Sequence, residues 1–303
     1  MGEWRWSDWK AGLLGLAAAL LVSAAHAQAS FPLLTWNGAD KDVLATFHAG
    51  GMVLKVSRRQ GDDDPQPVLD VMAPGAPPLH IVTKADAAFG GSLGVYRLDP
   101  LVSGPQVLFM TNTGGAHCCS DVIFAELDHG RWRVLKIGTF ESYPPKRLTD
   151  LDGDGQPEIA FPDPRFFYAL DCYACSGAPP QIFAIRAGKQ IDVSKERRFW
   201  PIVRKQLRSD RKQCLDHLNG FCASFVAEAA ILGEGRRAWA TMLRNYDPTN
   251  TAMLPRPCDV PRDGRYACPD GHEHPFAGFP EALDWFLFQA GYIKQRHALS
   301  TPR

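Results

Sequence analysis

A short acidic run near the middle of the chain is the feature that most limits its fold. From Asp150 to Glu158, aspartates stand at the first, third and fifth positions (Asp150, Asp152 and Asp154), a glycine at the sixth (Gly155) and a glutamate at the ninth. Oxygen side chains at alternate positions can wrap one hard cation, and calcium requires several oxygens at about 2.3 to 2.6 Å. The spacing therefore predicts a calcium site in a tight turn. An acidic, solvated turn rich in Asp and Gly is the alternative.

The residues that flank this run favour strands. A calcium site of the helix-loop-helix type has a bidentate glutamate at its twelfth position, where this chain has Phe161 inside the apolar run Ile159-Ala160-Phe161. Upstream, residues 146–149 are too few and too close to Pro144-Pro145 for an entering helix. We therefore expect the loop to be a turn between two strands.

The acidic run resembles the calcium loops of FG-GAP and VCBS repeats, which occur in integrin-type β-propellers with the pattern Asp-x-Asp-x-Asp-Gly-x-x-Asp. Glu158 stands where that pattern has its last aspartate. The resemblance implies calcium as the cofactor. It also implies side-chain ligation by Asp150, Asp152, Asp154 and Glu158, together with a backbone carbonyl ligand from Gln156.

A wider likeness extends over roughly residues 95–190. The segments Thr113 to Cys119, Asp150 to Phe161 and Phe166 to Ala169 are similar to parts of uncharacterised bacterial exported proteins that carry FG-GAP-like repeats. This likeness brings no established activity.

The first residues have the pattern of an export signal. Arg5 and Lys10 precede an apolar stretch, and Ala25-His26-Ala27 fits the small-x-small pattern of a cleavage site, so residues 1–27 are predicted to be a signal peptide. The mature chain would begin at Gln28. No later segment reaches the roughly 18 apolar residues that a membrane span needs. We expect a periplasmic or secreted protein with no membrane span in the mature chain.

The charge balance argues against two classes of partner. Lysine plus arginine total 33, aspartate plus glutamate also total 33, and no basic tract runs along the chain. Neither nucleic acid nor an anionic membrane surface is therefore indicated as a partner.

Residues 28–195 have the pattern of an antiparallel β domain. Short β-rich runs, several of which alternate apolar with polar residues, are separated by Gly, Pro and Asp. His129-Gly130 and Ala187-Gly188-Lys189 have the composition of hairpin turns. Residues 97–104 are weakly echoed by residues 147–155 at a blade-like spacing of about 50. We expect blade-like, propeller-related sheets, although the domain has room for only about three such units and closed propellers have four or more. The expected strands are 52–57, 105–110, 121–127, 131–137 and 181–186.

Residues 196–303 have a mainly helical pattern, so the whole chain is predicted to be an α+β, multi-domain protein. Pro201 can open the first helix, whose apolar spacing continues to a stop near Gly220. Further apolar stripes, typical of helices packed on a core, end at Gly233, at Asp247-Pro248 and at Gly291. A proline-rich loop over residues 247–278 separates the last two.

Eight cysteines in an exported chain indicate disulfides. Cys258 and Cys268 are expected to close the proline-rich loop, by bonding either to each other or to Cys214 and Cys222. Within one straight helix, Cys214 and Cys222 would be separated by more than two turns and could not bond each other.

The remaining cysteines support a second hypothesis. His117, Cys118 and Cys119, together with Cys172 and Cys175, could hold zinc or copper or could cycle as a redox dithiol, in an envelope metallo- or thiol-enzyme. The oxidising compartment, and the lack of a thioredoxin-like pattern around Cys172, favour structural disulfides. His272-Glu273-His274 is a further possible metal pair, for which solvated surface is the expectation.

Two nucleotide-binding signatures are absent from the sequence. The chain has no Gly-x-Gly-x-x-Gly cofactor loop and no phosphate-binding Gly-Lys-Ser/Thr. The leading hypothesis is therefore an exported, calcium-binding, non-enzymatic binding or scaffolding protein of the bacterial cell envelope. Its ligand, a protein or a carbohydrate, is not identified by the sequence.

Overall fold

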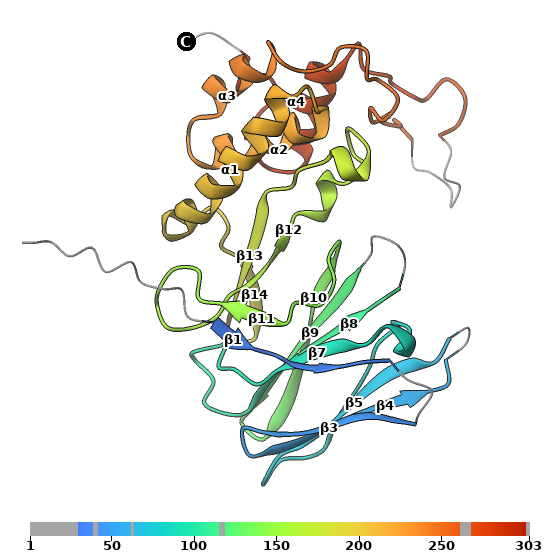
Figure 1. Cartoon of the computed structure of the whole chain (residues 1–303), viewed down its shortest axis with the longest axis vertical. Coiled ribbons are helices and arrows are strands. Elements are labelled where there is room, and N and C mark those ends of the chain that lie inside the picture. Colours follow the sequence, from blue (N-terminus) through green and yellow to red (C-terminus); the bar gives the residue numbers. More distant parts are fainter. Residues whose placement is uncertain (1–29, 39–41, 62–63, 115–118, 261–267, 301–303) are drawn as a thin grey trace, which may run out of the picture.

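Antiparallel sheets occupy the chain up to Asp192, and helices follow from Arg197 (Figure 1). The computed structural model describes residues 30–38, 42–61, 64–114, 119–260 and 268–300. The predicted α+β class is confirmed. The predicted signal peptide, residues 1–27, lies outside the described residues.

Alternation of apolar side chains builds the first sheet. In β4, Met52, Leu54 and Val56 are buried while the residues between them are half-buried, because successive side chains of a strand point to opposite faces. Gly50 and Gly51 both have positive φ and form the turn that precedes β4. The strands follow one another in chain order: β3 (Val43–Ala49), β4 (Met52–Arg59), β5 (Gln66–Met72) and β6 (Leu79–Val82).

The second sheet has a core on each face. Phe109 packs with Leu54 of the first sheet on one side. On the other side Phe140, at the end of β10, stacks on Phe161 with ring centroids 4.3 Å apart. The predicted turn at His129-Gly130 joins β9 to β10. The strands, in order across the sheet, are β10 (Arg131–Phe140), β9 (Ser120–Asp128), β8 (Gln106–Asn112), β7 (Gly91–Gly94) and β2 (Leu34–Trp36).

Shorter strands complete the β part. Ala187 and Gly188 have positive φ and form the predicted turn from β13 to β14. The relationship of these sheets to propeller blades stays a prediction. The strands are β12 (Ile159–Pro162), β13 (Pro180–Arg186) and β14 (Lys189–Asp192) in one sheet, and β1 (Ser30–Pro32) paired with β11 (Arg147–Thr149).

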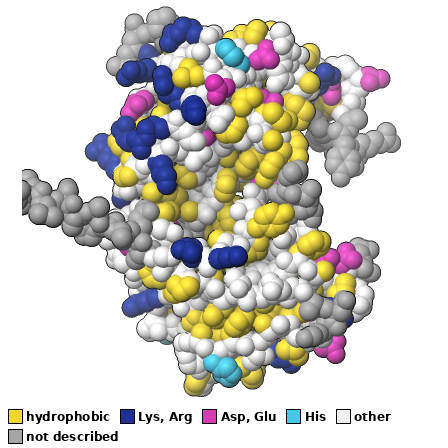
Figure 2. All heavy atoms as spheres, viewed as in Figure 1, with side chains coloured by type: hydrophobic (Ala, Val, Ile, Leu, Met, Phe, Trp, Pro, Cys, Tyr) yellow, Lys and Arg dark blue, Asp and Glu magenta, His cyan; other side chains and the backbone are white. Residues whose placement is uncertain are grey.

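The helices pack around α2, whose alanine-rich sequence is buried over most of its length. Its small side chains allow the neighbouring helices to approach closely, and Phe225, Trp239 and Leu283 lie in the shared core. Lys and Arg side chains gather on the side where α1 and α3 lie (Figure 2). The α-helices are α1 (Trp200–Leu215), α2 (Asn219–Ile231), α3 (Gly235–Met242) and α4 (Phe279–Gln289), and the short 3-10 helices are η1 (Ala87–Phe89), η2 (Pro164–Phe166), η3 (Tyr173–Cys175) and η4 (Arg197–Phe199).

One expectation about the cysteines is wrong. The first helix ends at Leu215, before Gly220, and the chain turns at His217, whose φ is 66°. Because this turn separates α1 from α2, Cys214 and Cys222 lie in different helices with Cα atoms 4.5 Å apart, and they form a disulfide. Cys258 and Cys268 bond each other.

A small apolar cluster lies where the sheets meet the helices. Phe199, at the end of η4, is 0% exposed and packs with Ile182 and Val193, and Leu151 of the acidic loop lies against the same cluster. The position of α1 therefore depends on a side chain seated in the β part.

Replacing Phe199 tests this junction. Phe199→Ala should lower the free energy of unfolding by about 3 to 5 kcal/mol, because a large cavity replaces a fully buried ring. Urea unfolding followed by circular dichroism measures the change. Phe288→Ala is the matched control: this ring is 39% exposed, and its loss should change stability by about 0.5 kcal/mol or less.

A buried acidic pair should make stability depend on pH. Glu228 in α2 and Asp210 in α1 are both 0% exposed. Burial, reinforced by the neighbouring Asp210, raises the pKa of Glu228 well above its usual value of 4.5. The folded protein keeps a proton that the unfolded chain releases, so this contribution to stability is fully present below pH 4.5 and is lost as pH rises through the raised pKa.

Glu228→Gln should remove this loss. Between pH 5 and 8 the variant's free energy of unfolding should fall less steeply than that of the wild type, by up to about 1.4 kcal/mol per pH unit. Glu281→Gln, on the exposed side of α4, is the control and should keep the wild-type slope. Equal slopes for wild type and Glu228→Gln would contradict the account.

Candidate metal centre

The acidic loop is a turn between strands. β11 precedes it, β12 follows it, and Thr149 pairs with Glu158 across its base, where the Glu158 amide donates to the Thr149 carbonyl at 3.1 Å. This pairing brings the two ends of the acidic run together, so that Glu158 lies beside Asp150.

Four carboxylates converge in the turn. Asp150, Asp152, Asp154 and Glu158 each offer one oxygen, and these oxygens all lie within 4.8 Å of one another. Asp150 is 4% exposed and Glu158 9% exposed, whereas Asp152 is half-buried and Asp154 is exposed. The fifth residue of the predicted set, Gln156, lies in the same turn, and its backbone amide donates to Oδ1 of Asp154 at 2.8 Å.

Backbone amides fix the turn in place. Both carboxylate oxygens of Asp150 accept amide hydrogens, from Gly153 at 2.7 Å and from Gly155 at 2.9 Å. Both glycines have φ in the left-handed region, 85° and 89°, which residues with a Cβ rarely adopt. The alternation of Asp and Gly is therefore what this backbone path requires.

The loop concentrates negative charge. Burial, with the charges of Asp152, Asp154 and Asp150, raises the pKa of Glu158 to about 7, although the amide of Leu151 donates to its Oε2 at 2.6 Å and lowers it. A bound cation would relieve this crowding, because it favours the ionised carboxylates.

Arg198 provides a cation from outside the loop. Its Nη1 donates to Oδ2 of Asp152 at 2.7 Å, so one face of the carboxylate cluster is linked to η4. A hollow of about 150 Å³ opens beside Asp154, Gln156 and Glu158, and Arg198 also lines it. Water or a further ligand can reach the cluster from this side.

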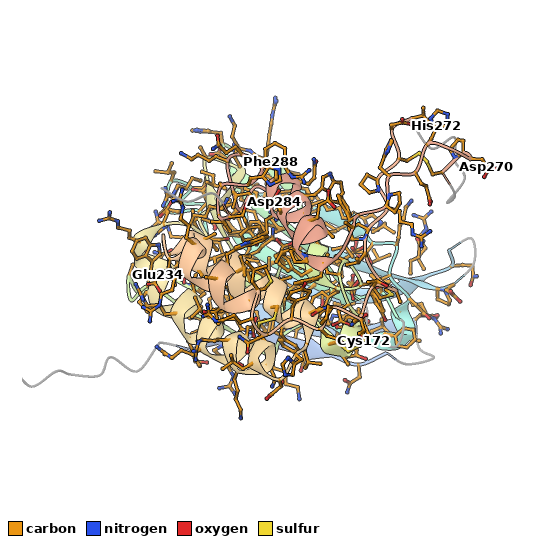
Figure 3. All side chains as sticks on the ribbon, turned by 90° about the horizontal axis from the view of Figure 1, so that it is seen from above. Cys172, Glu234, Asp270, His272, Asp284 and Phe288 are labelled. Atoms are coloured by element: carbon orange, nitrogen blue, oxygen red, sulfur yellow. A yellow bond between two sulfur atoms is a disulfide. The ribbon has the colours of Figure 1, made fainter. Side chains whose placement is uncertain are left out.

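His272 and His274, the second possible metal-binding pair, lie outside the acidic loop. His272 and His274 both contact the carboxylate of Asp259, at 2.6 and 3.1 Å. Figure 3 shows His272 on a loop that extends away from the body of the protein. The three residues form a polar cluster in which His274 and Asp259 are exposed and His272 is half-buried.

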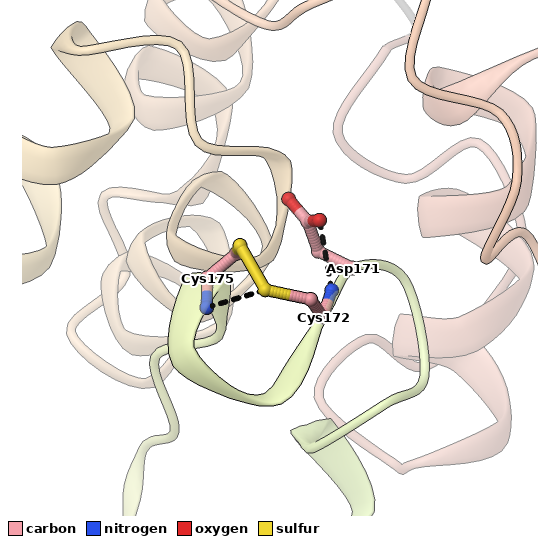
Figure 4. Close-up of side chains that lie close together, drawn as sticks. All are labelled: Asp171, Cys172 and Cys175. Atoms are coloured by element: carbon pink, nitrogen blue, oxygen red, sulfur yellow. Dashed lines mark hydrogen bonds between the residues drawn. A yellow bond between two sulfur atoms is a disulfide. The ribbon is translucent and has the colours of Figure 1, made fainter.

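The cysteine cluster is oxidised where the structure describes it. Cys172 and Cys175 form a disulfide beside Asp171 (Figure 4), and Cys119 is also disulfide-bonded. Thiolates, not disulfide sulfurs, ligate metals, so the pair offers no metal site in this state. His117 and Cys118 lie outside the described residues.

Sequence reasoning missed several features of these sites. Arg198 and Asp259 are distant in sequence from the residues they contact, and no local pattern points to them. The run Gly90-Gly91-Ser92-Leu93-Gly94 has the Gly-x-Ser-x-Gly spacing of a nucleophile turn. Ser92 lies within strand β7 and is 1% exposed, so it is not presented as a nucleophile.

Comparison with known proteins gives a match in the helical part. Residues 197–291 match the sll0997 C-terminal domain. The chain is 38% identical over 200 residues to the probable thylakoid lumen protein sll0997 of Synechocystis sp., covering 63% of this chain and 58% of that protein. It is 30% identical over 275 residues to the uncharacterized protein y4bJ of Sinorhizobium fredii, covering 86% of this chain and 42% of that protein.

The chain thus spans about half the length of the curated relatives it matches. No solved structure matches it. Within the described residues, no helix combines the length and apolar character that crossing a membrane requires.

The amide hydrogen bonds predict a structural role for Asp150 even without metal. In the presence of a chelator, Asp150→Ala should lower the free energy of unfolding by about 1 to 3 kcal/mol, because two amides lose their acceptor. Asp154→Ala removes one acceptor at an exposed position and should cost about 1 kcal/mol or less. Urea unfolding measures both, and equal losses would contradict the assignment.

Proposed function

We propose that the loop from Asp150 to Glu158 binds calcium and that the protein is an exported, non-enzymatic binding or scaffolding protein of the bacterial cell envelope. The observation that carries the proposal is that four carboxylate oxygens lie within 4.8 Å of one another in this turn. The backbone of the turn depends on Gly153 and Gly155, which both have positive φ. Asp150, Asp152, Asp154 and Glu158 would ligate through side chains and Gln156 through its carbonyl.

The ligand chemistry favours calcium over softer metals. All the proposed ligands are oxygens, and a flexible set of carboxylates and carbonyls suits calcium, which takes six to eight oxygens. Magnesium requires a stricter octahedron and retains its water. Zinc and copper favour nitrogen and sulfur ligands, and this loop contains neither histidine nor cysteine.

The role proposed for the ion is architectural. The five protein ligands would supply most of the six to eight oxygens that calcium takes, and water would fill the remaining positions through the hollow beside Asp154 and Glu158. The loop also lies at the junction between sheets and helices: Leu151 packs against the cluster of Phe199, and Asp152 pairs with Arg198. Calcium would stiffen this junction and the surface that binds a protein or carbohydrate ligand.

Two observations support an exported location. One relative is a probable thylakoid lumen protein, and disulfides occur in each part of the chain, as is common outside the reducing cytosol. We propose that this chain is periplasmic or secreted. Calcium sites of extracellular modules have dissociation constants near 10⁻⁴ to 10⁻³ M.

Calcium should therefore raise thermal stability. At about tenfold excess over the dissociation constant, the folded state gains roughly 1.4 kcal/mol. The measurement is the melting temperature after chelation and after titration with calcium or magnesium. Wild type should be stabilised by calcium more than by magnesium, and Asp154→Ala should lose most of the calcium response.

The matched control is Asp64→Ala, which removes an exposed aspartate that is distant in sequence from the loop. It should respond to calcium as the wild type does. A melting temperature that calcium leaves unchanged, in wild type and Asp152→Ala alike, would overturn the proposal.

A further inference from the structure

The disulfide between Cys172 and Cys175 lies at the surface. Cys172 is exposed and Cys175 half-buried, whereas Cys214 and Cys222 in the helical core are both 0% exposed. The surface bond joins cysteines only 3 residues apart, and a cross-link stabilises a fold less as the loop that it closes becomes shorter. Exposed disulfides are also the ones most readily exchanged.

A rigid frame holds this disulfide. The buried carboxylate of Asp171 accepts hydrogens from the Cys172 amide at 2.8 Å, from Asn250 Nδ2 at 3.0 Å and from the Gly220 amide at 3.2 Å. A side chain at Gly220 would come within 2.5 Å of the Cys175 carbonyl oxygen, so α2 packs directly on the loop. Opening the S–S bond would therefore leave the surrounding backbone tied to the helical core.

The two sulfurs are not equivalent. The amide of Cys175 donates to the sulfur of Cys172 at 3.2 Å, as the dashed line in Figure 4 marks. After reduction, the same donor would stabilise a thiolate on Cys172, because a hydrogen bond to the charged form favours that form. The same stabilisation makes Cys172, the more exposed of the two cysteines, the better leaving group once it is bonded to a partner sulfur.

Aromatic side chains surround the bond. Tyr173, between the two cysteines, stacks on Phe167 at 4.8 Å and lies 5.5 Å from Tyr168. Tyr168 is 51% exposed, so part of this aromatic group faces solvent. Hydrophobic side chains also face solvent around the waist between sheets and helices (Figure 2).

A groove of about 390 Å³ begins directly after the disulfide. Ser176 and Gly177 form part of it, and Phe161, Phe167 and Phe221 give it an aromatic lining. Phe167 belongs both to this groove and to the aromatic group that contacts Tyr173. An extended chain with apolar side chains could therefore lie in the groove while a cysteine reaches Cys172.

We propose that Cys172 and Cys175 form a thiol-disulfide exchange site for a cysteine-containing segment of another polypeptide, which docks on the surrounding aromatic side chains. A thiolate of the partner attacks the sulfur of Cys172, the bond to Cys175 breaks, and Cys175 leaves as a thiolate that takes a proton from water. The thiolate of a second cysteine in the partner then attacks the partner sulfur of the mixed disulfide, which forms the partner's own disulfide and releases Cys172 as a thiolate that takes a proton from water. The partner dithiol is oxidised by two electrons, and the Cys172–Cys175 disulfide is reduced.

This inference adds a redox activity that the non-enzymatic role proposed above does not include, and it does not depend on calcium. Regeneration of the bond requires a disulfide oxidant, which oxidised glutathione supplies in the experiment. The bond at Cys214 and Cys222 serves as an internal reference because it has no solvent access.

The first experiment measures which bond opens in the folded protein. The oxidised full-length chain is equilibrated in glutathione buffers of decreasing potential, alkylated and mapped by mass spectrometry, while circular dichroism reports folding. The Cys172–Cys175 bond should open at least about tenfold more readily than the Cys214–Cys222 bond. Opening of the surface bond only when the protein unfolds would overturn the proposal.

The second experiment identifies the attacked sulfur. Cys175→Ser leaves Cys172 to be trapped by oxidised glutathione, and Cys172→Ser leaves Cys175. Adducts should form at least about tenfold faster on Cys172, since it is exposed and its thiolate is stabilised. Equal rates in two folded variants would contradict the assignment of roles.

The third experiment tests docking. A synthetic peptide with two cysteines beside leucine and phenylalanine is oxidised by the protein, with glutathione as the small substrate. Tyr168→Ala should slow the peptide about two- to tenfold more than it slows glutathione, because one aromatic contact is lost. Met72→Ala, an exposed apolar residue on β5, is the control and should slow neither. An equal effect of Tyr168→Ala on both substrates would contradict a polypeptide partner.

Discussion

The carboxylate of Asp150 accepts amide hydrogens from Gly153 and Gly155, and this pair of hydrogen bonds closes the acidic loop. The closure places Glu158 back beside Asp150 and directs Leu151 into the cluster at the base of the helices. It also concentrates negative charge at one point, which the contact between Arg198 and Asp152 only partly offsets. The same hydrogen bonds therefore hold the proposed ion site and help to position the helical part.

Much of the fold could be predicted because it rests on local rules. The alternation in Met52 to Ser57 follows from the two faces of a strand, and the turns at His129-Gly130 and Ala187-Gly188 follow from residues that tolerate positive φ. The turn between strands at the acidic loop could be predicted because Pro144-Pro145 and Phe161 exclude flanking helices. In each case, a few adjacent residues decide the outcome.

The rest depends on contacts between distant residues. Arg198 reaches Asp152 across 46 residues, and Asp171 holds Gly220 across 49, so neither partner could be found from spacing. The pairing of Cys214 with Cys222 was misjudged for another reason. Apolar spacing continues through His217, and only the backbone reversal there shows that two helices are present. Periodicity reports which side chains are buried and is less sensitive to a break in the backbone.

The burial of Cys214 and Cys222 has a consequence for how the chain matures. Both sulfurs are sealed inside the helical core, beyond the reach of any oxidant or oxidoreductase once α1, α2 and α4 have packed. Their bond must therefore form while the chain is still open. Oxidation and helix packing are consequently ordered in time, and a chain that packed first in a reducing environment would carry two permanently trapped thiols.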